Sequence, residues 1–194
     1  MELCSGLPAG ELHQGRLLDT DAWFLTSTDP DEAARRRRCQ LSTLEDRDLL
    51  RALAGLPYAE PVAREGLSIA QRRVLDTAPV GVVESIGDSV KRVAQPLLRV
   101  HAAVVLHRQW AAGLTKASVF AGVCPRVLLL TGPAAIDAFD LTEAQFYGIG
   151  VIDASNPAEL EVLVLPDLTP RPFGPVSWRL TEIAAAQFGH LSSL

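Results

Sequence analysis

The side chains that most often carry out catalysis or bind metals are spread too widely in this sequence to act together. His101 and His107 are six residues apart on one expected strand, so they share a face but stand roughly 20 Å apart. Cys124 has no histidine nearby that would activate a thiol nucleophile. The three cysteines, Cys4, Cys39 and Cys124, lack metal-site spacing and fit reduced thiols. We therefore expect no catalytic residue, no metal site and no cofactor, and we favour a protein without enzymatic activity.

A second group of polar side chains is better suited to binding. The stretch LSIAQRRVLDTAP predicts a helix that begins after Ser68, which forms a capping box with Gln71. Glutamine suits adenine, and arginine suits guanine or phosphate, so Arg72 and Arg73 in the first turns of this helix are candidates for DNA contact. The full set of candidate DNA-binding residues is Ser68, Gln71, Arg72, Arg73, Lys91 and Arg92.

Nearby acids leave a different interpretation of this group open. Glu65, Asp76, Glu84 and Asp88 nearly cancel its positive charge. A surface balanced in this way also suits contact with another protein.

Four consecutive arginines, Arg35 to Arg38, close the stretch DPDEAARRRRC. Asp29, Asp31 and Glu32 precede them, so acids begin and bases end one short predicted helix. That order suits the helix dipole and favours a solvated helix end. The alternative is contact with a phosphate or a partner.

The bulk composition is that of a globular protein. Apolar residues make up 48% of the 194 residues and charged residues 21%, with a net charge of −5 that argues against broad, sequence-independent binding of nucleic acid. No apolar run approaches the roughly 20 residues of a membrane helix, and the N-terminus shows no secretory signal. We expect a cytoplasmic protein with no membrane contact.

The first half of the chain divides into an arm and a small helical domain. Residues 1–40 mix glycine, proline and acids and are predicted to form an N-terminal arm. Residues 41–96 are predicted to form a domain of three helices, which begin at a Ser42–Glu45 capping box, at Pro61 and at Ser68. A β-hairpin turning at Gly87-Asp88 follows.

The second half, residues 97–194, alternates apolar strands with helices. The predicted strands are LLRVHAAVVLHR, RVLLLTG, GIGVID and LEVLVLP, and the predicted helices include QWAAGLTKASVFAG and the terminal SWRLTEIAAAQFGHL. Strand–helix–strand units of this length imply a right-handed crossover. We expect a mixed-sheet α/β domain here, and α+β content overall.

The stretch from Leu44 to Gln95 resembles a winged helix-turn-helix domain. The resemblance rests on the order of three helices and a hairpin, with LLRALAGLP, LSIAQRRVL and GVVESIGDSVKRV as its segments. It implies that the helix after Ser68 enters a DNA major groove, that Lys91 and Arg92 reach backbone phosphates, and that the protein is a homodimer.

Residues 97–166 resemble the restriction-endonuclease-like PD-(D/E)xK core. The matching features are Trp110, AAGLTKAS, RVLLLT and YGIGVI. That family needs carboxylates that bind Mg²⁺ and a lysine near the attacking water. Counting back from Trp110 puts the acid and lysine positions near Val104 and Leu106, and neither side chain binds a metal. The resemblance implies a nuclease-shaped domain that is catalytically degenerate.

The favoured function is a non-enzymatic DNA-binding or regulatory protein whose nuclease-shaped domain serves dimerisation or partner contacts. One alternative is a metal-dependent nuclease that draws its acids from other positions, including Glu84 and Asp88. The other is a protein–protein adaptor in a larger assembly, which the acidic net charge and long apolar strands favour.

Overall fold

The chain folds into two compact units, each made of two separate stretches of sequence. A computed structural model describes residues 9–133, 136–156, 158–169 and 173–188. The first unit comprises residues 1–27 and 100–172, and the second comprises residues 28–99 and 173–194. Helices, a six-stranded mixed sheet and a three-stranded sheet confirm the predicted α+β content. The unit boundaries differ from the predicted ones at residues 40 and 96, because the strands on either side of the second unit belong to one sheet.

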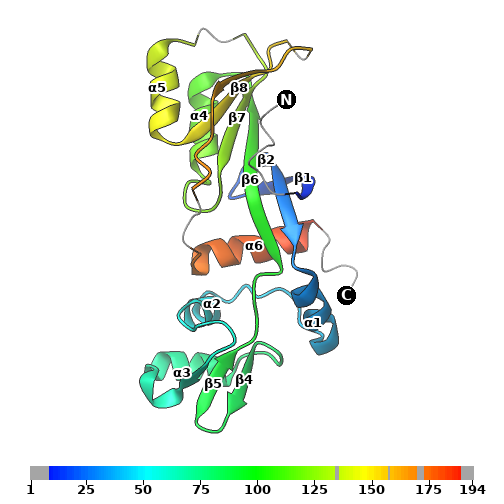
Figure 1. The fold of residues 1–194 in the computed structure, drawn as a ribbon, viewed down its shortest axis with the longest axis vertical. Helices are drawn as coiled ribbons and strands as arrows, with labels where there is room; N and C mark the ends of the chain where they lie inside the picture. The colour runs from blue at the N-terminus through cyan, green and yellow to red at the C-terminus, as the bar shows by residue number, and fades with distance from the viewer. Residues whose placement is uncertain (1–8, 134–135, 157, 170–172, 189–194) are drawn as a thin grey trace. The chain divides into compact units, whose positions relative to one another are not determined.

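The first unit is built on the six-stranded sheet, in the order β1-β2-β6-β7-β8-β9 (Figure 1). The strands are β1 (Glu11–Leu17), β2 (Thr20–Thr28), β6 (Leu98–His107), β7 (Arg126–Leu130), β8 (Ile149–Asp153) and β9 (Glu161–Val164). Strands β6, β7 and β8 are parallel, whereas β1 with β2 and β8 with β9 form antiparallel pairs. This is the mixed sheet that the apolar strands of the second half predict.

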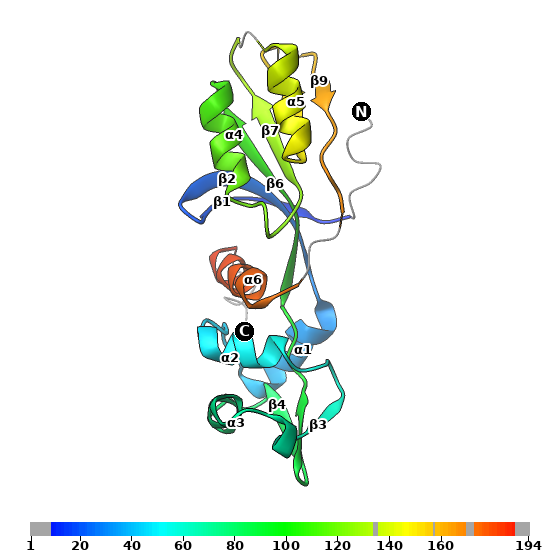
Figure 2. The ribbon, with the colours of Figure 1, turned by 90° about the vertical axis from the view of Figure 1, so that its left-hand side faces the viewer.

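Two helices connect the parallel strands and cover one face of the sheet. Helix α4 (Trp110–Ser118) joins β6 to β7, and α5 (Ala138–Phe146) joins β7 to β8 (Figures 1 and 2). The approach of α4 to the sheet is close, since a Cβ atom on Gly113 would stand 2.5 Å from a Leu128 methyl carbon. Phe120, after α4, packs edge-on against Phe24 of β2 at 5.4 Å between ring centroids. The predicted strand–helix–strand units are therefore confirmed.

The prediction of an N-terminal arm is wrong for residues 11–39. Strands β1 and β2 form a regular hairpin, from the Glu11–Thr26 pair to the Leu17–Thr20 pair. Its two-residue turn, Leu18 and Asp19, has φ values of 50° and 58°, as a type I′ turn requires. Leucine at such a position is unusual, because a side chain beyond Cβ disfavours the left-handed region. Because the turn consists of Leu18 and Asp19 rather than Asn and Gly, its sequence does not predict a hairpin.

The second unit contains three helices around a small sheet and a fourth helix from the end of the chain. Its elements are α1 (Pro30–Cys39), α2 (Arg47–Ala54), β3 (Pro61–Ala63), a 3-10 turn η2 (Arg64–Gly66), α3 (Ile69–Asp76), β4 (Val83–Ile86), β5 (Ser89–Arg92) and α6 (Pro175–Gln187). The sheet has the order β3-β5-β4. Helices α2 and α3 pack on each other, and α2 also packs on α6 (Figure 2).

The predicted helix starts of this unit are confirmed in one case and wrong in two. The Ser68–Gln71 capping box is present, and so is the hairpin at Gly87-Asp88. The Ser42–Glu45 box is wrong, because the Asp46 carboxylate caps α2 instead, at 2.8 and 2.9 Å from the N–H groups of Asp48 and Leu49. The helix predicted from Pro61 is wrong as well: Pro61 begins strand β3, which pairs with β5, and only η2 is helical.

The terminal helix was assigned by sequence to the second half of the chain, but α6 belongs to the second unit. Trp178 is fully buried in an apolar core with Leu50, Leu53 and Val90. Leu180 and Ala184 are buried too, whereas Ile183 and Phe188 are only partly buried. Helix α6 therefore completes the core of a unit whose other elements lie more than 70 residues earlier.

Candidate nucleic-acid interface

The first turns of α3 present the residues that the sequence proposes for DNA contact. The Ser68 hydroxyl accepts a hydrogen bond from the Gln71 backbone N–H at 3.2 Å, and the Gln71 amide oxygen accepts one from the Ser68 N–H at 3.0 Å. Leu75 is buried and anchors the inner side of the helix. Arg73 is exposed and Arg72 is half-buried. The capping box therefore fixes the start of a helix that exposes Arg73 and, in part, Arg72.

Arg72 and Arg73 are not neutralised by a carboxylate. Within the described residues, neither guanidinium has a hydrogen-bond or ion-pair partner. The acid nearest in sequence, Asp76, is paired with Arg64, whose guanidinium also donates to the Ser85 hydroxyl at 3.0 Å. Asp76, one of the four acids near this helix in the sequence, therefore neutralises Arg64 and not Arg72 or Arg73. The two arginines remain available to an anionic ligand.

Lys91 lies on β5 as expected, but it already has a counter-charge. Its ammonium is 2.6 Å from the Glu84 carboxylate on the neighbouring strand β4, with which it is paired in register. The Lys91 side chain is 25% exposed and that of Glu84 55% exposed, so the pair is partly solvated. A phosphate would have to compete with Glu84 for this lysine.

Arg92 points into the second unit, away from any ligand. Its guanidinium donates to the Leu53 carbonyl oxygen at 3.1 Å and lies 5.8 Å from the Tyr58 ring centroid and 5.4 Å from that of Trp178. Burial lowers the pKa of Arg92 below its ordinary value, and the opposing influence of Tyr58 is smaller. Arg92 therefore joins β5 to α2 and α6, so we remove it from the candidate phosphate contacts.

A buried ion network that the sequence did not reveal joins α1 to α6 in the second unit. The Arg36 guanidinium, fully buried, donates to Glu182 of α6 at 2.7 Å through two nitrogens and to Glu32 at 2.8 Å. It also donates to the Gln95 carbonyl oxygen at 2.8 Å. Glu182 accepts further bonds from the Leu44 backbone N–H and the Trp178 indole N–H, both at 3.0 Å.

The charges of this network balance one another. Burial lowers the pKa of Arg36, but the hydrogen bonds and charges of Glu182 and then Glu32 outweigh that effect, so the pKa lies above its ordinary value. Arg35 also bonds to Glu32, at 2.7 Å through Nε, and donates to the Gly81 carbonyl oxygen. The network thus pairs two arginines with two glutamates, and its net charge is zero.

The expectation of a solvated end for the whole arginine run is therefore wrong for Arg35 and Arg36. Arg37 and Arg38 are exposed, as predicted. The helix α1 does begin with acids and end with bases, with Asp29 as its N-cap. Which arginines turn inward follows from helical spacing, since Arg36 lies one turn after Glu32.

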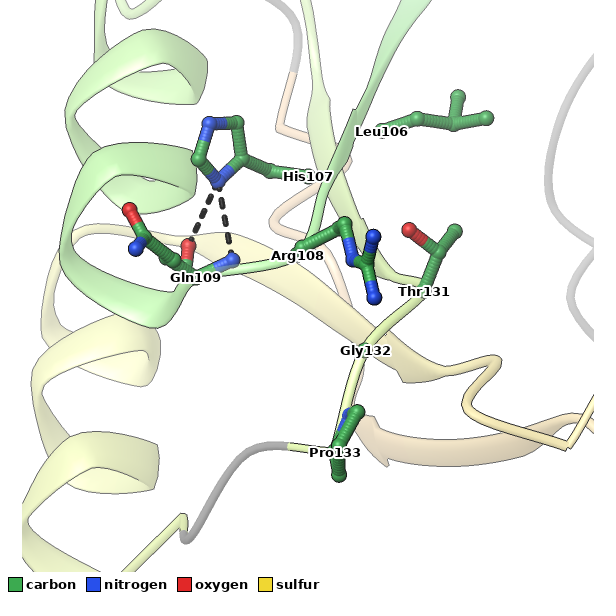
Figure 3. Close-up of a pocket in the computed structure, with 7 residues that line it drawn as sticks. All are labelled: Leu106, His107, Arg108, Gln109, Thr131, Gly132 and Pro133. Atoms are coloured by element: carbon green, nitrogen blue, oxygen red, sulfur yellow. Dashed lines mark hydrogen bonds between the residues drawn. The ribbon is translucent and has the colours of Figure 1, made fainter.

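The two β6 positions at which the expected resemblance to a nuclease core would put an acid and a lysine are apolar. Val104 and Leu106 of β6 stand in register with Val127 and Leu129 of β7 and share their face of the sheet. Leu106 is 43% exposed and points to the opposite side of β6 from His107 (Figure 3). Among the described residues, no three His, Cys, Asp or Glu side chains come together in a way that would hold a metal ion.

A hollow of about 590 Å³ lies at the carboxyl ends of β6 and β7 (Figure 3). It is lined by Leu106, His107, Arg108, Gln109, Thr131, Gly132 and Pro133. The His107 ring is engaged locally, with Nδ1 2.9 and 3.0 Å from the backbone oxygen and nitrogen of Gln109. Arg108 is the charged side chain of this lining, and none of the seven residues carries a carboxylate. The lining thus provides no carboxylate ligand for Mg²⁺.

The other sequence candidates have structural roles. The His101 ring is 2.7 Å from the Ser27 hydroxyl of β2, and His107 bonds to Gln109, so the two histidines serve different sites. Cys124 is buried before β7. Asp137 and Asp140 form the capping box of α5 rather than a free acidic pair.

Comparison of the chain with protein-family models, with curated proteins and with solved structures finds no match. Over the residues that the structure describes, no helix is both long and apolar enough to cross a membrane.

Proposed function

We propose that this chain is a non-enzymatic DNA-binding or regulatory protein that reads duplex DNA with α3. In this proposal α2, η2, α3 and the β4–β5 hairpin act as a winged helix-turn-helix module, α3 lies in the major groove, and Lys91 contributes at the hairpin. The nuclease-shaped sheet of the first unit serves dimerisation or partner contacts.

The observation that carries the proposal is the state of Arg72 and Arg73. On a capped helix, exposed Arg73 and half-buried Arg72 lack a carboxylate partner among the described residues. Arg64, Lys91 and Arg92, by contrast, are engaged. The planar guanidinium group of arginine can bond to guanine or phosphate through two N–H groups at once.

The distribution of charge between the two units also supports DNA binding by the second unit. The second unit carries thirteen Lys and Arg against twelve Asp and Glu, a net charge of +1, while the first unit accounts for the remaining −6. A polyanion is therefore repelled less by the second unit than the net charge of the chain suggests. DNA binding is expected to be modest in affinity and strongly salt-dependent.

Fluorescence-anisotropy titration of random and genomic duplex DNA at two salt concentrations tests the proposal. We expect the pair Arg72→Ala and Arg73→Ala to weaken binding by roughly tenfold or more and to flatten the salt dependence, because each arginine replaces counterions on the DNA. Arg51→Ala is the matched control, since Arg51 is an exposed arginine of α2 already paired with Asp48.

Two outcomes would contradict the proposal. Binding no tighter than that of an unrelated acidic protein would remove DNA as the ligand. Mg²⁺-dependent cleavage of the duplex, lost in Glu84→Gln, would favour the nuclease alternative instead. In the structure, Glu84 is the partner of Lys91 on the β4–β5 hairpin.

A second candidate function, a protein–protein adaptor, is favoured by one observation in the first unit. Helix α5 carries two phenylalanines that are more than three-quarters exposed. Exposed aromatic side chains of this kind mark interaction sites.

A further inference from the structure

We propose that the outer face of α5 docks a basic, amphipathic segment of a partner protein. This inference rests on the part of the proposed function that assigns partner contacts to the first unit, and it is independent of DNA binding by α3. It names the surface and the chemistry of the segment that covers it.

The outer face of α5 is aromatic. Phe139 is 76% exposed and Phe146 is 83% exposed, and their separation of seven positions places both on one side of the helix. Ala144, on the opposite side, is buried against the sheet. Tyr147, 47% exposed, extends the face, with its ring centroid 5.3 Å from that of Phe146. A surface helix normally places such side chains towards the core, so this face is built for a contact.

The area of this face matches one side of a protein interface. An aromatic side chain carries on the order of 200 Å², so these exposures leave about 400 Å² of aromatic surface. A standard interface buries about 800 Å² per partner, of which somewhat more than half, or about 450 Å², is apolar. The α5 face therefore supplies nearly the apolar part of a specific contact.

The charge around the face selects the partner. From residue 127 to residue 170 the chain carries seven acids and no lysine, arginine or histidine. Glu143 of α5 has no partner among the described residues, and α5 packs on β8 and β9. Asp153 of β8 and Glu161 of β9 are paired in register, so both side chains leave the same face of the sheet, and the Asp153 carboxylate accepts a hydrogen bond from the Ser155 N–H at 2.8 Å. Like charges in such a pair are unfavourable until a cation approaches them.

Two cations border this acidic stretch. Arg126 is buried at the start of β7 and donates to the Tyr147 carbonyl oxygen, whereas Arg108 lies at the carboxyl ends of the strands. Arg108 follows β6, whereas Asp153 ends β8, two strands away and thus roughly 10 Å across the sheet. A second copy of the chain would bring Glu143 and its neighbours against themselves, and a nucleic acid would be repelled. A protein segment with lysines or arginines beside apolar side chains satisfies both the aromatic surface and the carboxylates.

Binding of a synthetic amphipathic peptide of leucine and lysine to the full chain, followed by fluorescence anisotropy without DNA, tests the proposal. We expect the pair Phe139→Ser and Phe146→Ser to weaken binding roughly tenfold or more, because it removes the aromatic anchors. The pair Glu143→Gln and Glu161→Gln should weaken binding and lower its salt dependence. Leu12→Ser is the matched control, since Leu12 is an exposed apolar residue of the same unit, 56% exposed on β1.

Three results would overturn the proposal. One is equal binding of the peptide to the wild-type chain and the Phe139→Ser, Phe146→Ser variant. Another is equal binding of a peptide in which glutamate replaces lysine. The third is a dimer in sedimentation velocity that this variant converts to monomer, because a second copy would then cover the face. None of these measurements involves duplex DNA, so their failure is distinguishable from a failure of the DNA-binding proposal.

Discussion

Arg36 is the residue on which the second unit depends most. Its charge is fully buried and is balanced by Glu32 and Glu182, which come from α1 and α6. A buried ion pair contributes little net stability, but the loss of one member leaves an unpaired charge in the interior. The network therefore serves to hold α1, α6 and the connection at Gln95 in one arrangement.

Arg36→Met is expected to lower the free energy of unfolding by about 3–5 kcal/mol, because Glu182 would remain buried without its cation. Urea denaturation followed by circular dichroism measures this change. Arg37→Met, at the exposed neighbouring position, is the control and should leave the midpoint unchanged. Equal effects of the two substitutions would show that the network does not bear on stability.

At the scale of single elements, the turn of the β1–β2 hairpin is poorly matched to its residues. Its turn places Leu18 and Asp19 in the left-handed region, which costs on the order of 1–2 kcal/mol for a residue with a Cβ. The ladder of the hairpin nevertheless forms without irregularity. We infer that the pairing of β2 with β6 in the sheet stabilises the hairpin, and that the turn residues contribute little to its stability.

Replacing Leu18 by Asn together with Asp19 by Gly is expected to stabilise the protein by about 1 kcal/mol, because Asn-Gly prefers a type I′ turn. The loss of the Arg16–Asp19 ion pair, at 3.8 Å, matters little. Thermal unfolding measures the effect. As a control of opposite sign, Gly87→Ala should destabilise the β4–β5 turn, where φ is +54° and no atom lies near the missing Cβ. A fall in midpoint for the Asn-Gly variant would contradict the assignment of strain to the turn.

At the scale of the whole molecule, both units are discontinuous, and the terminal helix is essential to one of them. The second unit buries Trp178 of α6 among residues of α2 and β5, and Glu182 of α6 balances Arg36. The first unit contains no element after β9 among the described residues. Loss of α6 should therefore affect the two units very differently.

A chain that ends at residue 172 is expected to keep the six-stranded sheet and to lose the fold of the second unit. Limited trypsin digestion should cleave it rapidly at arginines between residues 28 and 99, while residues 100–169 stay protected. The truncated chain should also lose DNA binding, because α3 belongs to the second unit. The full-length chain is the reference, and equal protection of both chains would contradict the role of α6.

Local features of this protein could be predicted from sequence because their causes lie within a few residues. The capping box at Ser68, the turn at Gly87-Asp88 and the apolar strands β6 and β7 each follow from neighbouring side chains. The same reasoning placed Arg72 and Arg73 in the first turns of α3, and it identified the absence of a carboxylate from β6.

Only the tertiary structure decided the features whose causes lie far apart in the chain. The Arg92 guanidinium turns inward because it contacts the Trp178 ring and donates to the Leu53 carbonyl oxygen. Arg36 is buried because it pairs with Glu182, which lies 146 residues later in the chain. Lys91 forms its ion pair with Glu84 only because β4 and β5 pair in register. Helix α6 and the β1–β2 hairpin likewise take their places from partners distant in sequence. Local propensity reports the conformation of a segment, whereas burial and charge pairing depend on which segments meet.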